Sequence, residues 1–140
     1  MERLPEANYW SVIYTEARNI LHVDQSEWNK QKVDNLWKTE SFVKESMRFV
    51  GDACFEMRRK VMTPSGINLS DGTHLPFGTT VGLPSNAIHN DDQFYPEAKL
   101  FDGLRFLKLR ESHDMNTARG SLLTATSNTF LQFGHGKHGW

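Results

Sequence analysis

The feature that most limits how this chain can fold is a long stretch, Asn90–Thr129, in which hydrophobic periodicity fades and turn-forming residues are frequent. Loops of that length are unusual in a free-standing domain. The stretch therefore predicts a segment that lies against a larger body of structure. The chain has 140 residues, enough for one domain, and its single cysteine, Cys54, excludes an internal disulfide framework.

Charge and hydropathy exclude several classes of partner. Sixteen Lys and Arg residues face 17 Asp and Glu residues, giving a net charge of -1, so neither nucleic acid nor an anionic membrane is an expected partner. No apolar run is long enough to span a bilayer, and the first residues lack the pattern of a signal peptide. We therefore expect a soluble chain located in the cytoplasm.

Helical spacing marks two segments in the first third of the chain. Pro5 can open an amphipathic helix, whose apolar residues are Tyr9, Ile13, Ala17 and Ile20 or Leu21. Residues 22–32 are polar and predict a connection. A second helix is predicted to begin near Thr39, a suitable cap, and to run to about Val50.

The second helix carries two apolar stripes and an acidic residue between them. The stripes, Val43–Met47–Val50 and Phe42–Phe49, predict burial on more than one side. Glu45 projects from the Phe42–Phe49 stripe, where a carboxylate needs a partner, and Arg48 is within reach on the same helix. By spacing alone, an exposed pair worth about half a kcal/mol or less is the simpler interpretation.

The hydrophobic period changes from Arg58 onward, and the first strand signals begin at Ile67. Ile67–Leu69 and Thr73–Pro76 flank Asp71-Gly72, a dipeptide typical of a two-residue hairpin turn. Thr79–Leu83 predicts another short strand, and Pro84–His89 predicts one helical turn. Helices followed by small antiparallel strands predict an α+β fold.

The last eight residues, Phe133–Trp140, read FGHGKHGW and contain three glycines in the outline G-x-G-x-x-G. A dinucleotide-binding turn needs a strand before it and a helix after it, and the sequence provides no such context. His135 and His138 could bind zinc, but no third and fourth ligands lie nearby at suitable spacing. The glycines most simply predict a tight loop whose backbone closely approaches another group.

Together, several segments resemble the C-terminal part of a cytochrome P-450, and fungal members most closely. They are KESMR at Lys44–Arg48, RKV at Arg59–Val61, LSDGTHLPFGTTV at Leu69–Val81, AIHNDDQFYPEAKLFDGLRF at Ala87–Phe106, and FLQFGHGKHG at Phe130–Gly139. The resemblance covers nearly the whole chain. It implies that residues 1–140 form a single incomplete domain with a partial cytochrome P-450 fold.

The resemblance also implies roles for particular residues. Glu45, Arg48 and Arg105 match a buried three-member ion network that is structural. Arg59, with Arg58 as the alternative, and His138 match ligands of the haem propionates. Phe133 and Gly136, with His138, match the loop that wraps the haem. A stretch that often faces substrate corresponds to residues 52–56, including Asp52, Cys54 and Phe55.

The departure from the family lies at the haem ligand. The family's loop carries a cysteine whose thiolate binds the iron and favours O–O cleavage, and that position falls on Trp140. An indole N–H only donates hydrogen bonds. Gly51 also departs from the proline usual after the Glu-x-x-Arg helix. We therefore expect no metal ligand, no catalytic residue and no stably bound haem in this chain.

The main hypothesis is a truncated product of a haem-thiolate monooxygenase gene. The full-length enzyme would oxidise a small lipophilic substrate, such as a fungal terpenoid, with O₂ and electrons from a reductase, and would be anchored in the endoplasmic reticulum membrane. If an intron that interrupts the cysteine codon were retained, translation would yield tryptophan followed by a stop codon. We therefore expect the DNA after the Gly139 codon to read TGGTAA or TGGTGA. Decay of the gene and deliberate truncation of the coding sequence are the alternatives. Exposed apolar surface would promote self-association.

Two other hypotheses remain open from the sequence. The chain could be an interaction module that pairs with a partner chain, which co-purification would reveal. It could also be an unrelated small protein that uses His135 and His138 to bind zinc, which stoichiometric zinc would reveal.

Overall fold

A computed structural model describes residues 8–22, 27–51, 56–111 and 114–138, and all structural statements concern these residues. The helices are α1 (Tyr9–His22), α2 (Lys30–Asp34), α3 (Trp37–Val50), α4 (Ser85–His89), α5 (Arg105–Arg110) and α6 (Met115–Gly120), with a short 3-10 helix at Gly136–His138. The strands are β1 (Glu56–Lys60), β2 (Ile67–Asn68), β3 (His74–Leu75) and β4 (Thr80–Leu83). The chain thus combines helices with small sheets.

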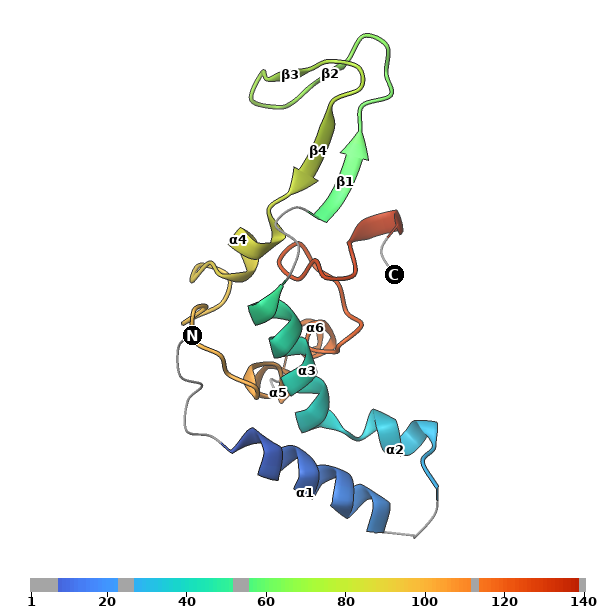
Figure 1. Ribbon diagram of the computed structural model, residues 1–140, viewed down its shortest axis with the longest axis vertical. Coiled ribbons are helices and arrows are strands. Elements are labelled where there is room, and N and C mark those ends of the chain that lie inside the picture. The colour runs from blue at the N-terminus through green and yellow to red at the C-terminus, as the bar shows by residue number, and fades with distance from the viewer. Residues whose placement is uncertain (1–7, 23–26, 52–55, 112–113, 139–140) are drawn as a thin grey trace.

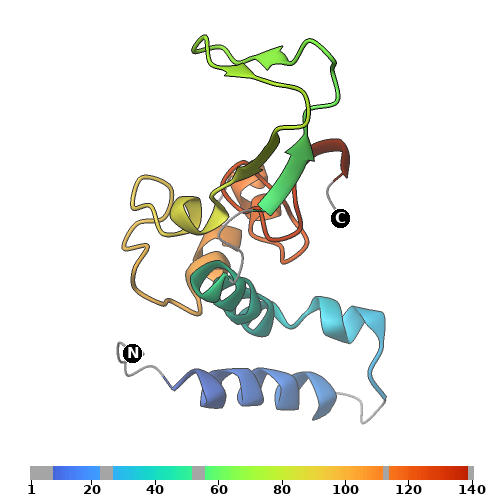
Figure 2. The same cartoon turned by 45° about the horizontal axis from the view of Figure 1, so that its top comes forward.

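The molecule is elongated, with α3 at its centre (Figure 1). Helix α1 lies at one end and the β2–β3 hairpin at the other, while α5 and α6 lie beside α3 (Figures 1 and 2). Two antiparallel pairs, β1–β4 and β2–β3, form the sheets. In the hairpin, Ile67 pairs with Leu75 and Asn68 with His74, and the turn contains Gly72 at a φ of 89°.

Helix α3 begins two residues earlier than expected, and Thr39 is not its cap. The capping position is Leu36, which makes no side-chain hydrogen bond to the helix. Glu16 of α1 instead accepts hydrogen bonds from the backbone N–H groups of Lys38 (2.8 Å) and Thr39 (2.9 Å). A carboxylate at a helix N-terminus satisfies unpaired N–H groups and suits the helix dipole, so a tertiary contact replaces the local cap.

Only part of the Val43–Met47–Val50 stripe is buried. Met47 packs against the core, whereas Val43 and Val50 are 39% and 66% exposed. The buried residues of α3 are polar: Ser41, Lys44, Glu45 and Arg48. Apolar periodicity did not predict this polar face, because segments that hydrogen-bond to these side chains cover it.

Two regions expected to be irregular contain short helices. Helix α2 falls partly in the predicted 22–32 connection and extends beyond it, and α5 and α6 lie within the Asn90–Thr129 stretch. Helices of five or six residues are too short to produce a clear hydrophobic period. From Asn90 to the start of α5, and from the end of α6 to His135, the backbone is irregular.

The main core lies under this irregular segment. Tyr95, Ala98, Phe106 and Phe130 form its buried cluster, against which Met47 and Phe133 pack. A second aromatic group joins α1 to α3: Tyr9, Phe42 and Phe101 have ring centroids 5.4–5.6 Å apart. Both groups combine residues of helices with residues of the irregular segment, so that segment is part of the core.

Candidate functional site

Glu45 is fully buried between the guanidinium groups of Arg48 and Arg105. Arg48 donates to both carboxylate oxygens, with Nη2–Oε1 2.7 Å and Nε–Oε2 2.8 Å. Nε of Arg105 lies 3.2 Å from each oxygen, and the backbone N–H of Asp102 donates to Oε1 at 3.1 Å. The structure therefore brings together the three residues expected to form an ion network, and their pairing is buried rather than exposed.

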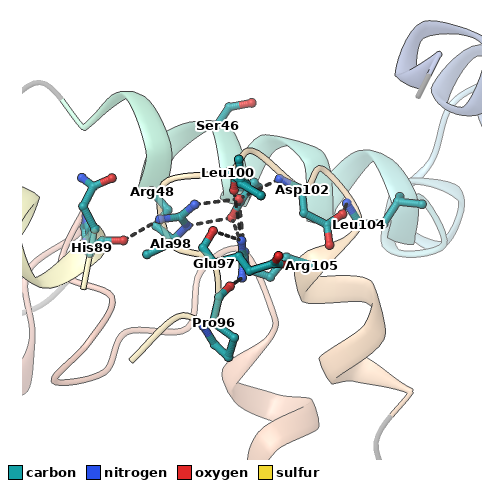
Figure 3. Close-up of polar contacts among 12 residues, drawn as sticks. Ser46, Arg48, His89, Pro96, Glu97, Ala98, Leu100, Asp102, Leu104 and Arg105 are labelled. Atoms are coloured by element: carbon teal, nitrogen blue, oxygen red, sulfur yellow. Dashed lines mark hydrogen bonds and ion pairs between the residues drawn. The ribbon is translucent and has the colours of Figure 1, made fainter. Parts of the chain in front are cut away.

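The two arginines use their remaining N–H groups to bind backbone carbonyls. Arg48 Nη1 donates to the carbonyl of His89. Arg105 donates to the carbonyls of Pro96 (2.6 Å), Glu97 (3.3 Å) and Leu100 (3.1 Å) (Figure 3). One carboxylate and several carbonyl oxygens thus satisfy two cations, an arrangement that fixes backbone and leaves no acid free for proton transfer.

Lys44 is the second buried cation of α3, after Arg48, and sequence reasoning gave it no role. Its ammonium donates to the carbonyls of Gly120 (2.8 Å), Leu122 (2.5 Å) and Ala125 (3.3 Å). It also lies over the Phe130 ring, 4.3 Å from the centroid. Burial lowers its pKa to about 8, partly offset by the charge of Glu40. Lys44 ties the segment after α6 to the centre of α3.

His89, at the end of α4, is the second residue that sequence reasoning missed. Its side chain is fully buried, and its Nε2 accepts a hydrogen bond from the backbone N–H of Leu131 at 3.1 Å. Burial and then the charge of Arg48 lower its pKa to about 4. Nothing local marked this histidine; its only signal was its place in the AIHND segment.

The glycine-rich loop leaves the core near Phe133, which is half-buried. Gly134 and Gly136 have φ values of 72° and 76°, which favour glycine. A Cβ at Gly136 would meet no atom within 4 Å, so the loop presents open space there. Nδ1 of His135 lies 3.2 Å from the hydroxyl of Thr126, which gives that ring a protein partner.

The expected propionate ligands are only partly described. Arg58 and Arg59 lie on β1 with exposed side chains, and Arg59 Nη1 donates to the carbonyl of Arg58 at 3.0 Å. His138 lies in the 3-10 helix, but its side chain falls outside the described part. Asp52, Cys54, Phe55 and Trp140 also lie outside the described residues.

The cofactor that the resemblance implies is haem, and the position that matches the family's cysteine is Trp140. Its indole N–H only donates hydrogen bonds, so this side chain does not fit as an iron ligand. In the described part of the chain, no group of three or more His, Cys, Asp or Glu side chains could hold a metal ion.

Known proteins are similar to this chain over most of its length. The cytochrome P-450 family profile matches residues 9–139, and the chain belongs to this family. It is 85% identical over 139 residues to cytochrome P-450 monooxygenase avaH of Aspergillus versicolor, covering 99% of this chain and 30% of that protein. It is 39% identical over 111 residues to cytochrome P-450 monooxygenase 71 of Postia placenta, covering 79% and 21%. To cytochrome P-450 monooxygenase terK of Tolypocladium album it is 33% identical over 121 residues, covering 86% and 23%.

The chain therefore spans less than a third of the length of these relatives. In the described ranges, no helix is both long and apolar enough to cross a membrane.

Proposed function

We propose that this chain is a piece of a fungal cytochrome P-450 monooxygenase that carries the scaffold of the haem loop but does not itself catalyse oxidation. The observation that carries the proposal is the buried network of Glu45, Arg48 and Arg105, because all three members lie within this chain and match the family's motif positions. The role of the network is structural. Trp140 stands where the family has its cysteine, so the chain lacks the thiolate.

The full-length enzyme would oxidise a small lipophilic substrate, and a fungal terpenoid is the class to test first. It would use haem, O₂ and electrons from a reductase, and it would be anchored in the endoplasmic reticulum membrane, whereas this chain alone would be cytoplasmic. In that enzyme, Arg59 (or Arg58) and His138 would bind the haem propionates, since cationic and N–H donors suit these anions. Phe133 and Gly136 would shape the haem loop, and residues 52–56, which include Asp52, Cys54 and Phe55, would face substrate.

Carbon monoxide difference spectroscopy tests the proposal. The purified chain is mixed with haem, reduced with dithionite and exposed to carbon monoxide, with the full-length Aspergillus versicolor relative as the positive control. We expect the Soret band of a thiolate-ligated carbonyl complex in the relative and not in this chain. That band in the 140-residue chain would refute the proposal.

The Trp140→Cys variant separates two causes of a negative result. A thiolate-type band in the variant would assign the loss of haem binding to the missing ligand. Its absence would assign the loss to the missing two thirds of the domain.

A second candidate function is an interaction fragment that pairs with another chain. The observation that favours it is exposed apolar surface on two helices: Trp10 of α1 is 77% exposed and Val50 of α3 is 66% exposed. Co-expression with the remainder of the Aspergillus versicolor relative tests it, because a pairing fragment would co-elute with that remainder as a stoichiometric complex.

A further inference from the structure

We infer that neutral His89 is a positioning residue that joins the ion network of α3 to the start of the haem loop. Its backbone carbonyl accepts a hydrogen bond from Arg48 Nη1, and its ring Nε2 accepts one from the N–H of Leu131 at 3.1 Å. Figure 3 shows His89 beside Arg48 at the edge of the network. His89 of α4 is thus hydrogen-bonded to Arg48 of α3 on one side and to Leu131, at the start of the loop, on the other.

Leu131 lies two residues before Phe133, near which the loop leaves the core. Its side chain is 1% exposed, and its carbonyl accepts the N–H of Gly134 at 2.9 Å, which closes the first turn of the loop. Since His89 holds the N–H of the same residue, both backbone polar groups of Leu131 are occupied. Movement of the His89 ring would therefore move the loop's first turn relative to α3.

The contact with Leu131 fixes the protonation state of the ring. Nε2 can accept a hydrogen bond only when it carries no proton, so the neutral ring must carry its proton on Nδ1. Nδ1 is buried and has no hydrogen-bond partner among the described residues. A buried N–H without an acceptor costs free energy, so this tautomer is selected by the contact with Leu131 and by packing.

Packing holds the ring in a fixed plane. It stacks on Phe130 with centroids 5.6 Å apart and an interplanar angle of 27°, and its edge faces Tyr95 at 6.4 Å. The Tyr95 hydroxyl donates to the carbonyl of Thr129, so the loop segment and the ring share this neighbour too.

The charged neighbour of the ring is Arg48 of α3, whose carboxylate partner Glu45 is shared with Arg105. The irregular segment contributes the titratable hydroxyl of Tyr95, and the loop segment contributes the neutral Gln132, which donates to the carbonyl of Met47. Protonation would place a second cation beside Arg48 and remove the acceptor for Leu131. The contact therefore requires the neutral ring, which burial and Arg48 favour.

The name haem loop rests on the family that the proposed function assigns, whereas the role of His89 rests on geometry alone. Neither haem nor enzymatic activity is needed to test that role. The test is NMR on the isotopically labelled 140-residue chain without haem. Ring nitrogen shifts at pH 7 should report a proton on Nδ1 and none on Nε2. The Leu131 amide should exchange slowly with solvent at pH 7, and its protection should be lost on acidification together with His89 protonation.

Three variants separate the acceptor from the ring. His89→Gln places its amide oxygen near the position of Nε2 without a titrating group, so Leu131 should stay protected on acidification to a lower pH than in the unmodified chain. His89→Phe retains the ring without an acceptor, so the exchange of Leu131 should accelerate at least tenfold at pH 7 while the amides of Phe106 and Tyr95 change little. His89→Asn, which moves the oxygen near Nδ1, should resemble the Phe variant.

Several results would overturn the inference. They are a proton on Nε2 in the unmodified chain, equal exchange of Leu131 in the His89→Phe variant, and an unprotected Leu131 amide at pH 7. If the Phe variant does not fold, the ring shifts and the exchange of Leu131 in the unmodified chain decide the matter.

Discussion

Replacing Glu45 with glutamine should remove a large part of the chain's stability. The substitution preserves side-chain volume but removes the charge that Arg48 and Arg105 share, and it turns one acceptor oxygen into an NH₂ group that faces N–H donors. The carboxylate receives four contacts from the two guanidinium groups at 2.7–3.2 Å and one from the N–H of Asp102. Removing one partner of a buried ion pair costs about 3–5 kcal/mol. Since domains are stable by about 5–15 kcal/mol, this loss is about a fifth of the total or more.

Urea unfolding followed by tryptophan fluorescence measures the effect. The matched control is Asp34→Asn, which breaks the Lys30–Asp34 pair, whose side chains are 89% and 56% exposed. An exposed pair of this kind is worth about 0.5 kcal/mol or less. If Glu45→Gln shifts the free energy of unfolding by no more than the control does, the network does not stabilise the fold.

Four further perturbations test other parts of the structure. Lys44→Met leaves the carbonyls of Gly120, Leu122 and Ala125 without their donor and should cost about 3 kcal/mol, with amide exchange accelerated in residues 120–125; unchanged exchange there would contradict it. The pKa of His89 is about 4 in the fold and 6.5 when unfolded, so the unfolded state binds more protons between these two pH values. The free energy of unfolding should therefore fall by at most about 3 kcal/mol as the pH falls from 6.5 to 4. An equal dependence of the unfolding free energy on pH in His89→Gln would refute this. Gly66→Ala should destabilise the β2–β3 hairpin more than Gly72→Ala, although both glycines have positive φ. A Cβ at Gly66 would lie 2.5 Å from the carbonyl oxygen of Leu75, whereas Gly72 faces open space. Equal decreases in melting temperature for the two variants would rule this out. Val50→Lys should raise the monomer fraction in sedimentation experiments, since Val50 is exposed on α3, and an unchanged distribution would place self-association elsewhere.

Local patterns in the sequence predicted the helices and strands whose formation depends on nearby residues. The spacing of Tyr9, Ile13 and Ala17 predicted the helix that became α1, and Asp71-Gly72 predicted the hairpin, in which Gly72 has positive φ. Strand β1 was not predicted, because its sequence EMRRK has no alternation and its pairing with β4 is interrupted by a bulge. Helix α6 had a signal that was overlooked: Asp114 accepts from the N–H groups of Asn116 and Thr117, as an N-cap residue does.

The candidate site likewise combines contacts that local sequence patterns predict with contacts that they do not. The contact between Glu45 and Arg48 follows from i,i+3 spacing on a helix, but its burial depends on Arg105, 60 residues farther along the chain. No local pattern distinguishes His89 or Lys44 from surface residues, because their partners are backbone groups of remote segments. Resemblance to the family's motif predicted the role of Arg105, whereas the roles of Lys44 and His89 became visible only in the structure.

The polar face of α3 explains how so long an irregular segment is ordered at all. Buried backbone N–H and C=O groups must be paired, and a segment without regular helices or strands cannot pair most of them internally. In this chain α3 supplies partners from its side chains. Ser41 accepts from the N–H of Leu107, Glu45 accepts from the N–H of Asp102, and Arg48 donates to the carbonyl of His89. Lys44 donates to the carbonyls of Gly120, the last residue of α6, and of Leu122 and Ala125. Glu40 accepts from the N–H of Leu123. The polar face of α3 therefore pairs backbone groups of the segments around it, as a neighbouring strand does in a sheet, which is why the buried residues of this helix are polar.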